Sequence, residues 1–196
     1  VRLAFCTIHA DALNELQLEQ HNILNLRTVR MGIATRRLRI LVMGVGNTLM
    51  QDDGVGTAVT DRLGAAPDAN SDLELIDGGT IGLSLLPQIE DADGVIIVDA
   101  AELEAPPGTV RIFLDDEIDR QLSGKRRTVH EVALVDLFSA AAIRGRMPPR
   151  RALVAVQPAC TEWGVELTDT VKAAVPDACS LIRQLADQWL TAADAA

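Results

Sequence analysis

The chain has 196 residues, of which 48% are apolar, and a formal net charge of −10. This length and apolar content suffice for one domain with a full-sized core. The negative charge argues against nucleic acid as a partner, because contacts with phosphates require a basic surface. No apolar run reaches the roughly 18 residues typical of a transmembrane helix, so we expect no membrane insertion.

The chain contains three widely separated cysteines, Cys6, Cys160 and Cys179, and no CxxC pair. This spacing indicates neither a structural zinc site nor a disulfide framework. It favours a reducing compartment, and we expect the protein in the cytoplasm.

Residues 1–37 show no strand alternation and no well-capped helical pattern. The chain begins with Val1 and carries Met31 shortly before the first strong strand pattern. Two explanations stay open: translation starts at Met31, or the segment is a loosely ordered arm. We interpret 1–37 as an N-terminal extension of a domain at 38–192. A chain that starts at Met31 is expected to fold and function normally.

From residue 38 on, apolar strand patterns alternate with helical patterns. Strands are predicted at 38–43, 73–76, 95–98, 109–114 and 152–156. Helices are predicted at 54–65, 81–90, 128–144 and 166–192, the last with a break or kink at Pro176. The first strand is a continuous apolar run, as in strands buried on both faces. The alternation predicts an α/β fold with a mostly parallel sheet covered by helices on both faces.

Three polar side chains stand where this pattern predicts chemistry. Asp53 comes after the turn that follows the first strand, Asp99 closes the third strand, and His130 begins the helix after the fourth strand. Ligands of open α/β sheets bind outside the carboxyl ends of the strands. Two carboxylates and one imidazole can bind a borderline divalent metal such as nickel or zinc and leave coordination positions open. No local feature requires a charge at Asp99, which favours a functional role there.

The neighbouring polar residues also have purely structural interpretations. Asp52 and Asp53 can accept hydrogen bonds from the first backbone N–H groups of the following helix, and we expect Asp52 to be only such a cap. Thr128 and Glu131 match a capping box, which places His130 one residue into its helix.

The turn at 44–49 resembles part of a dinucleotide-binding fingerprint. Such a site needs GxGxxG after a strand, but Leu49 occupies the third glycine position. Asp77 imitates the acid that binds the ribose, although it follows a long connection. No Walker A sequence and no GxSxG elbow occur. We therefore expect no nucleotide cofactor and keep a nucleotide-binding α/β enzyme as an alternative.

A series of short motifs extends from the first strand to the start of the C-terminal helix. They are Ile40–Leu49, Asp52–Gly56, Asp77–Thr80, Val98–Ala100, Pro107–Thr109, His130, Gln157–Pro158 and Glu162–Gly164. In this order they resemble the hydrogenase maturation protease family. The resemblance covers about residues 38–190, and the joint pattern is highly specific although each motif alone is weak.

The resemblance implies a three-layer α/β/α sandwich around a mostly parallel, twisted sheet of about five strands. It implies an endopeptidase that removes a C-terminal extension from the large-subunit precursor of a nickel–iron hydrogenase after nickel insertion. It also implies that Asp53, Asp99 and His130 meet nickel, which the substrate supplies. Family members carry glutamate or aspartate at the position of Asp53. The chain departs from the family pattern in residues 1–37 and in Cys160.

Further site residues follow from the same pattern. We expect Asn47, Asp77, Gly78, Gly79 and Thr80 to contact the substrate. The expected partner is the precursor, and the expected state of the protein is a monomer.

The catalytic mechanism stays open at this point. A carboxylate can activate water beside a metal, or Asp53 and Asp99 can share a proton as an aspartic pair. A nickel chaperone that uses the same three ligands without catalysis stays an alternative to the peptidase.

Overall fold

The computed structural model of the protein describes residues 38–66, 73–80, 82–122 and 129–194. The expectations for the extension at 1–37 and for Met31 lie outside these residues and stay predictions. Among the residues described, no helix combines the length and the apolarity that crossing a bilayer requires.

Five strands form one sheet in the order β2-β1-β3-β5-β4. They are β1 (Ile40–Val45), β2 (Leu73–Gly79), β3 (Gly94–Ala100), β4 (Val110–Leu114) and β5 (Arg151–Val156). β1 pairs in parallel with β2 and β3, and β3 pairs in parallel with β5, whereas β4 is antiparallel to β5. The prediction of a mostly parallel sheet is therefore confirmed.

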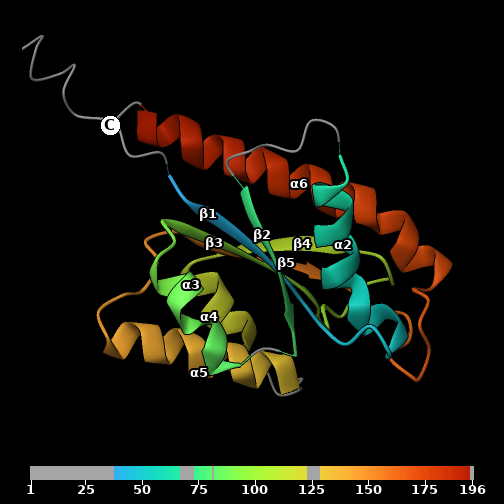
Figure 1. Ribbon diagram of the computed structural model, residues 1–196. Coiled ribbons are helices and arrows are strands. Elements are labelled where there is room, and N and C mark those ends of the chain that lie inside the picture. The colour runs from blue at the N-terminus through green and yellow to red at the C-terminus, as the bar shows by residue number, and fades with distance from the viewer. Residues whose placement is uncertain (1–37, 67–72, 81, 123–128, 195–196) are drawn as a thin grey trace, which may run out of the picture. The chain divides into compact units, whose positions relative to one another are not determined.

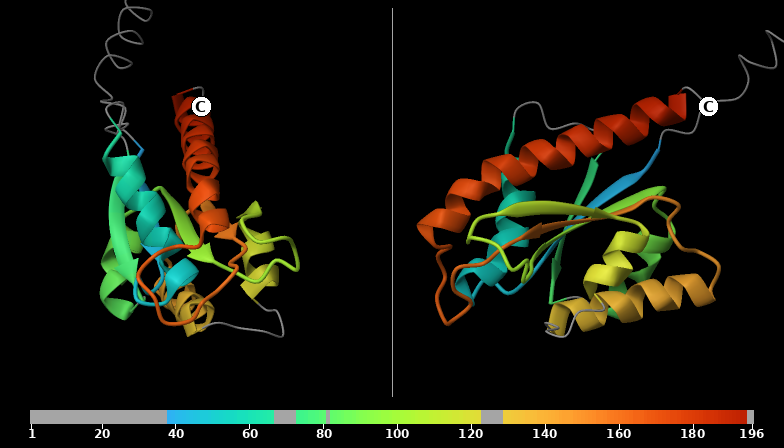
Figure 2. Two further views of the ribbon diagram at one scale, coloured as in Figure 1. Left: turned by 90° about the vertical axis from the view of Figure 1, so that its right-hand side faces the viewer. Right: turned by 180° about the vertical axis from the view of Figure 1, so that it is seen from behind.

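Helices cover both faces of the sheet, as Figures 1 and 2 show. One layer consists of α2 (Val55–Gly64) and α6 (Asp169–Asp194), and the other of α3 (Leu86–Glu90), α4 (Asp116–Leu122) and α5 (Val129–Ile143). The short 3-10 turns η1 (Gln51–Gly54) and η2 (Leu83–Leu85) precede α2 and α3. The three-layer α/β/α sandwich is confirmed.

Strand alternation assigns each apolar side chain to one of two cores. In β1, Ile40 and Val42 pack in the core beneath α2 and α6, whereas Leu41 and Met43 pack beneath α3, α4 and α5. Successive side chains of a strand point to opposite faces, so two cores require strands that are apolar at every position. This explains why the β1 segment is a continuous apolar run.

Two helices differ from the prediction. α4 is not predicted, because it has only seven residues and buries only Ile118 and Leu122. Of the break or kink predicted at Pro176, the break is wrong, since α6 runs through this residue as one helix of 26 residues. Pro176 is exposed, and the residues around it bury a continuous apolar face against the sheet and α2. This packing outweighs the single backbone hydrogen bond that proline removes.

The strand order locates the site. The chain leaves β1 for β2 on one side and later returns to β3 on the other side, so β1 and β3 enclose the topological switch point. Crevices that bind ligands form outside the carboxyl ends of such strands.

Candidate active site

Asp53, Asp99 and His130 come together at the switch point. Asp53 lies in η1 after β1, Asp99 is the sixth residue of β3, and His130 is the second residue of α5. Val95 and Ile97 of β3 point toward the layer that contains α5. Because strand side chains alternate, Asp99 points to this same side.

The three side chains are nearly enclosed. His130 Nδ1 lies 3.6 Å from Asp53 Oδ1 and 3.9 Å from Asp99 Oδ1. Both distances exceed those of a hydrogen bond. His130 is 7% exposed, and in the described part of the chain its Nδ1 is buried without a hydrogen-bond partner. A buried polar atom of this kind indicates a ligand or a functional role.

Asp53 is oriented by the backbone turn that precedes it. Asn47 N donates to Asp53 Oδ2 at 2.9 Å, which leaves Oδ1 as the oxygen nearer to His130. The side chain of Asn47 accepts a hydrogen bond from Leu49 N at 3.0 Å and thereby closes the local turn. Gly46 adopts a φ of +135°, and a Cβ there would lie 1.7 Å from the carbonyl oxygen of Asp53. The glycine thus permits the close approach that positions Asp53.

Asp52 has a role that differs from the predicted one. It does not cap the following helix, because neither η1 nor α2 has a side-chain hydrogen bond at its N-terminus. Asp52 is fully buried, and its oxygens accept hydrogen bonds from the backbone N–H groups of Ala159, Cys160 and Thr168 and from the hydroxyl of Thr168. Asp52 therefore fastens the loop between β5 and α6 to the segment that carries Asp53.

The segment Asp77–Thr80 lies at the end of β2, beside the turn after β1. Asp77 Oδ1 accepts hydrogen bonds from Thr57 Oγ1 at 3.3 Å and from Gly79 N at 2.9 Å. Gly46 N donates to the carbonyl oxygen of Gly79 at 2.8 Å and joins the two turns. Asp77 and Thr80 are exposed, so these residues stand at the rim of the site.

The described residues do not include the predicted capping box, and they contain no preformed metal site. Thr128 lies outside the described residues, as does the side chain of Glu131, so the capping box stays a prediction. In the described part of the chain, no group of three or more His, Cys, Asp or Glu side chains is arranged to hold a metal ion.

The chain is similar to known hydrogenase maturation proteins over most of its length. The model of the hydrogenase maturation protease family matches residues 58–185. The HupD hydrogenase expression/formation protein of Bradyrhizobium diazoefficiens is 35% identical over 155 residues, which are 77% of this chain and 79% of that protein. The hydrogenase 2 maturation protease of Escherichia coli is 35% identical over 142 residues, covering 72% and 86% of the two chains. This chain belongs to the hydrogenase maturation protease family.

Solved structures agree with this family assignment. The hydrogenase maturating endopeptidase HybD from E. coli superposes with a TM-score of 0.67 at 35% identity, covering 74% of this chain and 90% of that one. The nickel–iron hydrogenase maturation protease HybD from Thermococcus kodakarensis gives a TM-score of 0.65 at 26% identity, covering 76% and 99%. The protein is thus a member of a peptidase family, and the matched segment 58–185 includes Asp99 and His130.

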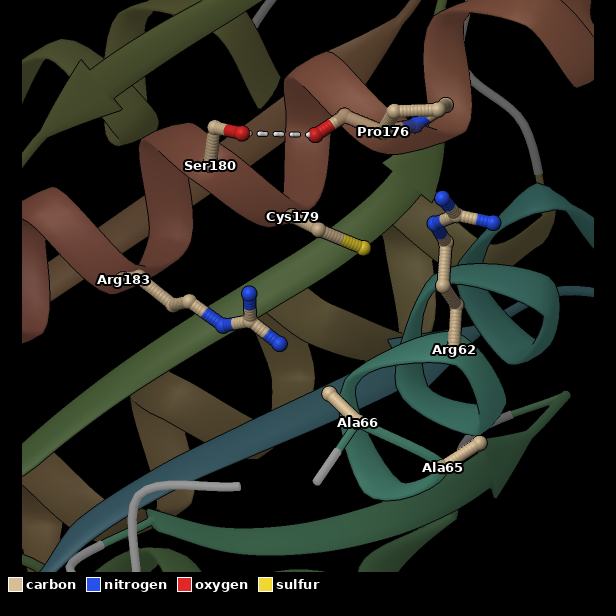
Figure 3. A pocket seen from close by; sticks show the side chains of 7 residues that line it. All are labelled: Arg62, Ala65, Ala66, Pro176, Cys179, Ser180 and Arg183. Atoms are coloured by element: carbon tan, nitrogen blue, oxygen red, sulfur yellow. Dashed lines mark hydrogen bonds between the residues drawn. The ribbon is translucent and has the colours of Figure 1, made fainter. Parts of the chain in front are cut away.

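One pocket of this family member lies away from the cluster. It is located between α2 and α6, and Figure 3 shows the side chains of Arg62 and Arg183 on either side of Cys179. None of the three clustered side chains lines it. This pocket is therefore separate from the cluster at the switch point.

Proposed function

We propose that this protein is an endopeptidase that removes the C-terminal extension from the large-subunit precursor of a nickel–iron hydrogenase after nickel insertion. The observation that carries the proposal is the buried His130 Nδ1 beside two carboxylates, in a member of a maturation protease family. The substrate and the nickel follow from the family resemblance. The cytoplasm as location and the monomer as functional state are parts of the same proposal.

The three side chains have the donor chemistry that a divalent nickel ion requires. Two carboxylates and a neutral imidazole supply oxygen and nitrogen lone pairs with a charge that complements a dication. Bonds of about 2.0–2.2 Å place neighbouring donors of one ion roughly 3.0–3.4 Å apart. The distances of 3.6 and 3.9 Å shorten to this range when the side chains shift by less than about 1 Å. We therefore propose that Asp53, Asp99 and His130 recognise nickel that is already bound in the precursor.

The two aspartates have different surroundings, which supports different roles. The side chain of Asp99 is 4% exposed, whereas that of Asp53 is 15% exposed. We propose that Asp99 and His130 serve as ligands and that Asp53, which is more open to solvent, also orients or deprotonates the attacking water. This metal-assisted reaction is favoured over an aspartic pair with a shared proton, since the imidazole nitrogen approaches both carboxylates.

The turn after β1 supports this function over nucleotide binding. A dinucleotide phosphate needs free backbone N–H groups and open space above the glycines. Here Asn47 N already donates to Asp53, and the carbonyl oxygen of Asp53 occupies the space next to Gly46. The acidic side chain in this position also repels a phosphate.

The test is mass spectrometry of the nickel-loaded precursor before and after addition of this protein. The parental protein is expected to shorten the precursor. His130→Ala and Asp99→Asn are expected to fold and to leave its mass unchanged, because the first removes one nickel ligand and the second removes the negative charge of another. Asp136→Asn is the matched control, since Asp136 lies exposed on the same helix α5.

The outcomes separate the alternatives. Cleavage at the parental rate by both His130→Ala and Asp99→Asn contradicts the three-ligand site. Transfer of nickel to a nickel-free precursor without any change of mass supports the chaperone instead. A dinucleotide that raises the melting temperature supports the nucleotide-binding enzyme.

A further inference from the structure

The loops after β1 and β5 are paired beside the active site. Gln51 N donates to the carbonyl oxygen of Gly164 at 2.8 Å, and Gly164 N donates to that of Leu49 at 3.0 Å. A Cβ at Gly164 would lie 2.7 Å from Cγ of Gln51, so a larger residue there would have to displace the Gln51 side chain. The left view of Figure 2 shows the two loops side by side at this end of the sheet. Together with the bonds to Asp52, this pairing makes the β5–α6 loop a fixed part of the site.

Large apolar side chains are exposed on these paired loops. Trp163 is 79% exposed, Val165 is 75% exposed and Leu49 is 48% exposed. Leu83, after β2, and Val132, at the start of α5, are also exposed at the same edge of the sheet. The described ranges contain seven exposed large apolar residues. Five of them are the residues just named at this edge of the sheet, and the other two, Leu114 and Ile143, lie elsewhere.

The exposure of Trp163 is a property of a fixed loop. The next residue, Gly164, makes two backbone hydrogen bonds: its carbonyl oxygen accepts from Gln51 N, and its N–H donates to the carbonyl oxygen of Leu49. A tryptophan that a rigid backbone holds in water loses the favourable burial of its large apolar ring. Such exposed aromatic residues on rigid backbones commonly act as anchors in protein interfaces.

A peptide that reaches the cluster must also cross this surface. An extended chain advances about 3.3 Å per residue, so residues two to four positions from the scissile bond lie roughly 7–13 Å from the cluster. Leu49 precedes Asp53 by only four residues, and Trp163 is adjacent in sequence to the residue that bonds Leu49. The paired loops are therefore within reach of the segment that flanks the cleaved bond.

We infer that Trp163, Val165 and Leu49 form a docking surface for apolar side chains of the precursor segment next to the scissile bond. This inference rests on the proposed function and adds to it the means by which the polypeptide is held. The occupant is the precursor, because the surface adjoins the cluster that the scissile bond must reach. A second copy of this chain is the competing occupant.

The experiment measures cleavage of the nickel-loaded precursor by Trp163→Ala. We expect KM to rise at least about tenfold, as for the removal of an interface anchor, with kcat changed less than about twofold. The melting temperature is expected to stay unchanged, since the side chain is mostly exposed. Ile143→Ala is the matched control, because Ile143 is 87% exposed at the other end of α5 and is expected to leave KM unchanged.

A binding measurement separates this inference from the proposed function. Trp163→Ala is combined with Asp99→Asn, and binding of the precursor is compared with that of Asp99→Asn alone. Weaker binding supports the docking surface. If the parental protein cleaves and Trp163→Ala has a parental KM, the docking surface is wrong and the peptidase stands. If the parental protein neither binds nor cleaves the precursor, the proposed function fails. A parental dimer that Trp163→Ala dissociates shows a second copy on this surface and overturns the inference.

Discussion

The adjacent residues Asp52 and Asp53 are expected to give opposite phenotypes when each is changed to asparagine. Asp52 is fully buried and accepts four hydrogen bonds, three of them from backbone N–H groups. An asparagine has one carboxamide oxygen and an amino group that accepts no hydrogen bond. If the oxygen replaces Oδ2, the amino group faces the N–H of Thr168, and if it replaces Oδ1, the amino group faces those of Ala159 and Cys160.

The expected loss of stability in Asp52→Asn follows from the number of hydrogen bonds that Asp52 accepts. At least one buried N–H loses its acceptor, which costs about 1–3 kcal/mol, and the remaining bonds lose the strength that a charged acceptor gives. We expect Asp52→Asn to lower the free energy of unfolding by about 2–4 kcal/mol. For a domain of this size the melting temperature then falls by about 5–15 °C.

Asp53→Asn is the matched control for stability. Among the described residues, the one hydrogen bond recorded for its side chain comes from Asn47 N, and a carboxamide oxygen can still accept it. The melting temperature is expected to change by less than about 2 °C, whereas cleavage of the nickel-loaded precursor is lost. Thermal unfolding by circular dichroism and mass spectrometry of the precursor measure both properties. An unchanged melting temperature in Asp52→Asn, or full cleavage by Asp53→Asn, would refute the assignment of these two roles.

Two further predictions concern a glycine and a cysteine. Gly46→Ala is expected to prevent folding or cleavage, because its Cβ would lie 1.7 Å from the carbonyl oxygen of Asp53. Gly145→Ala is the control, since a Cβ there meets no atom within 4 Å. It is expected to lower the free energy of unfolding by only about 1–2 kcal/mol, because of the positive φ at this position. Soluble yield and melting temperature check this pair, and a normally folded Gly46→Ala would contradict it. Burial raises the pKa of the Cys179 thiol, so less of the reactive thiolate forms near pH 8. Native protein should be alkylated at half-buried Cys160 and spared at Cys179 until urea unfolds it, and peptide mapping that finds equal labelling of both would overturn this prediction.

Much of the architecture follows from local patterns that the sequence contains. The five apolar strands and four of the helices are recognisable because each has its own periodicity and buried face. α4 escapes this reasoning, since Ile118 and Leu122 are its only buried residues and its first turn is acidic. The acidic first turn followed by an i, i+4 apolar pair is the signal that predicts it in retrospect.

Part of the candidate site is likewise predictable from the sequence, and part is not. Asp99 and His130 are predictable, because a charge at the end of an apolar strand and an imidazole at the start of a helix both point to the carboxyl edge of the sheet. The role of Asp52 is not, because its partners lie 107 to 116 residues later in the sequence. A local pattern contains the acceptor but not the donors, so capping is the simplest local interpretation and it is wrong.

The interactions of Asp52 also explain how a strained backbone persists beside the active site. Gln51 has a φ of +47°, in the left-handed region that costs a non-glycine residue about 1–2 kcal/mol. Its N–H is bonded to Gly164, and the next residue, Asp52, is held by four hydrogen bonds, so the surrounding contacts determine this conformation. The same turn directs Asp53 toward His130 and holds the β5–α6 loop in place. Under the proposed function, nickel recognition and peptide docking thus share one preorganised element. A precursor without nickel can use only the docking surface, and an unrelated nickel protein only the cluster, so efficient cleavage requires both contacts from one substrate.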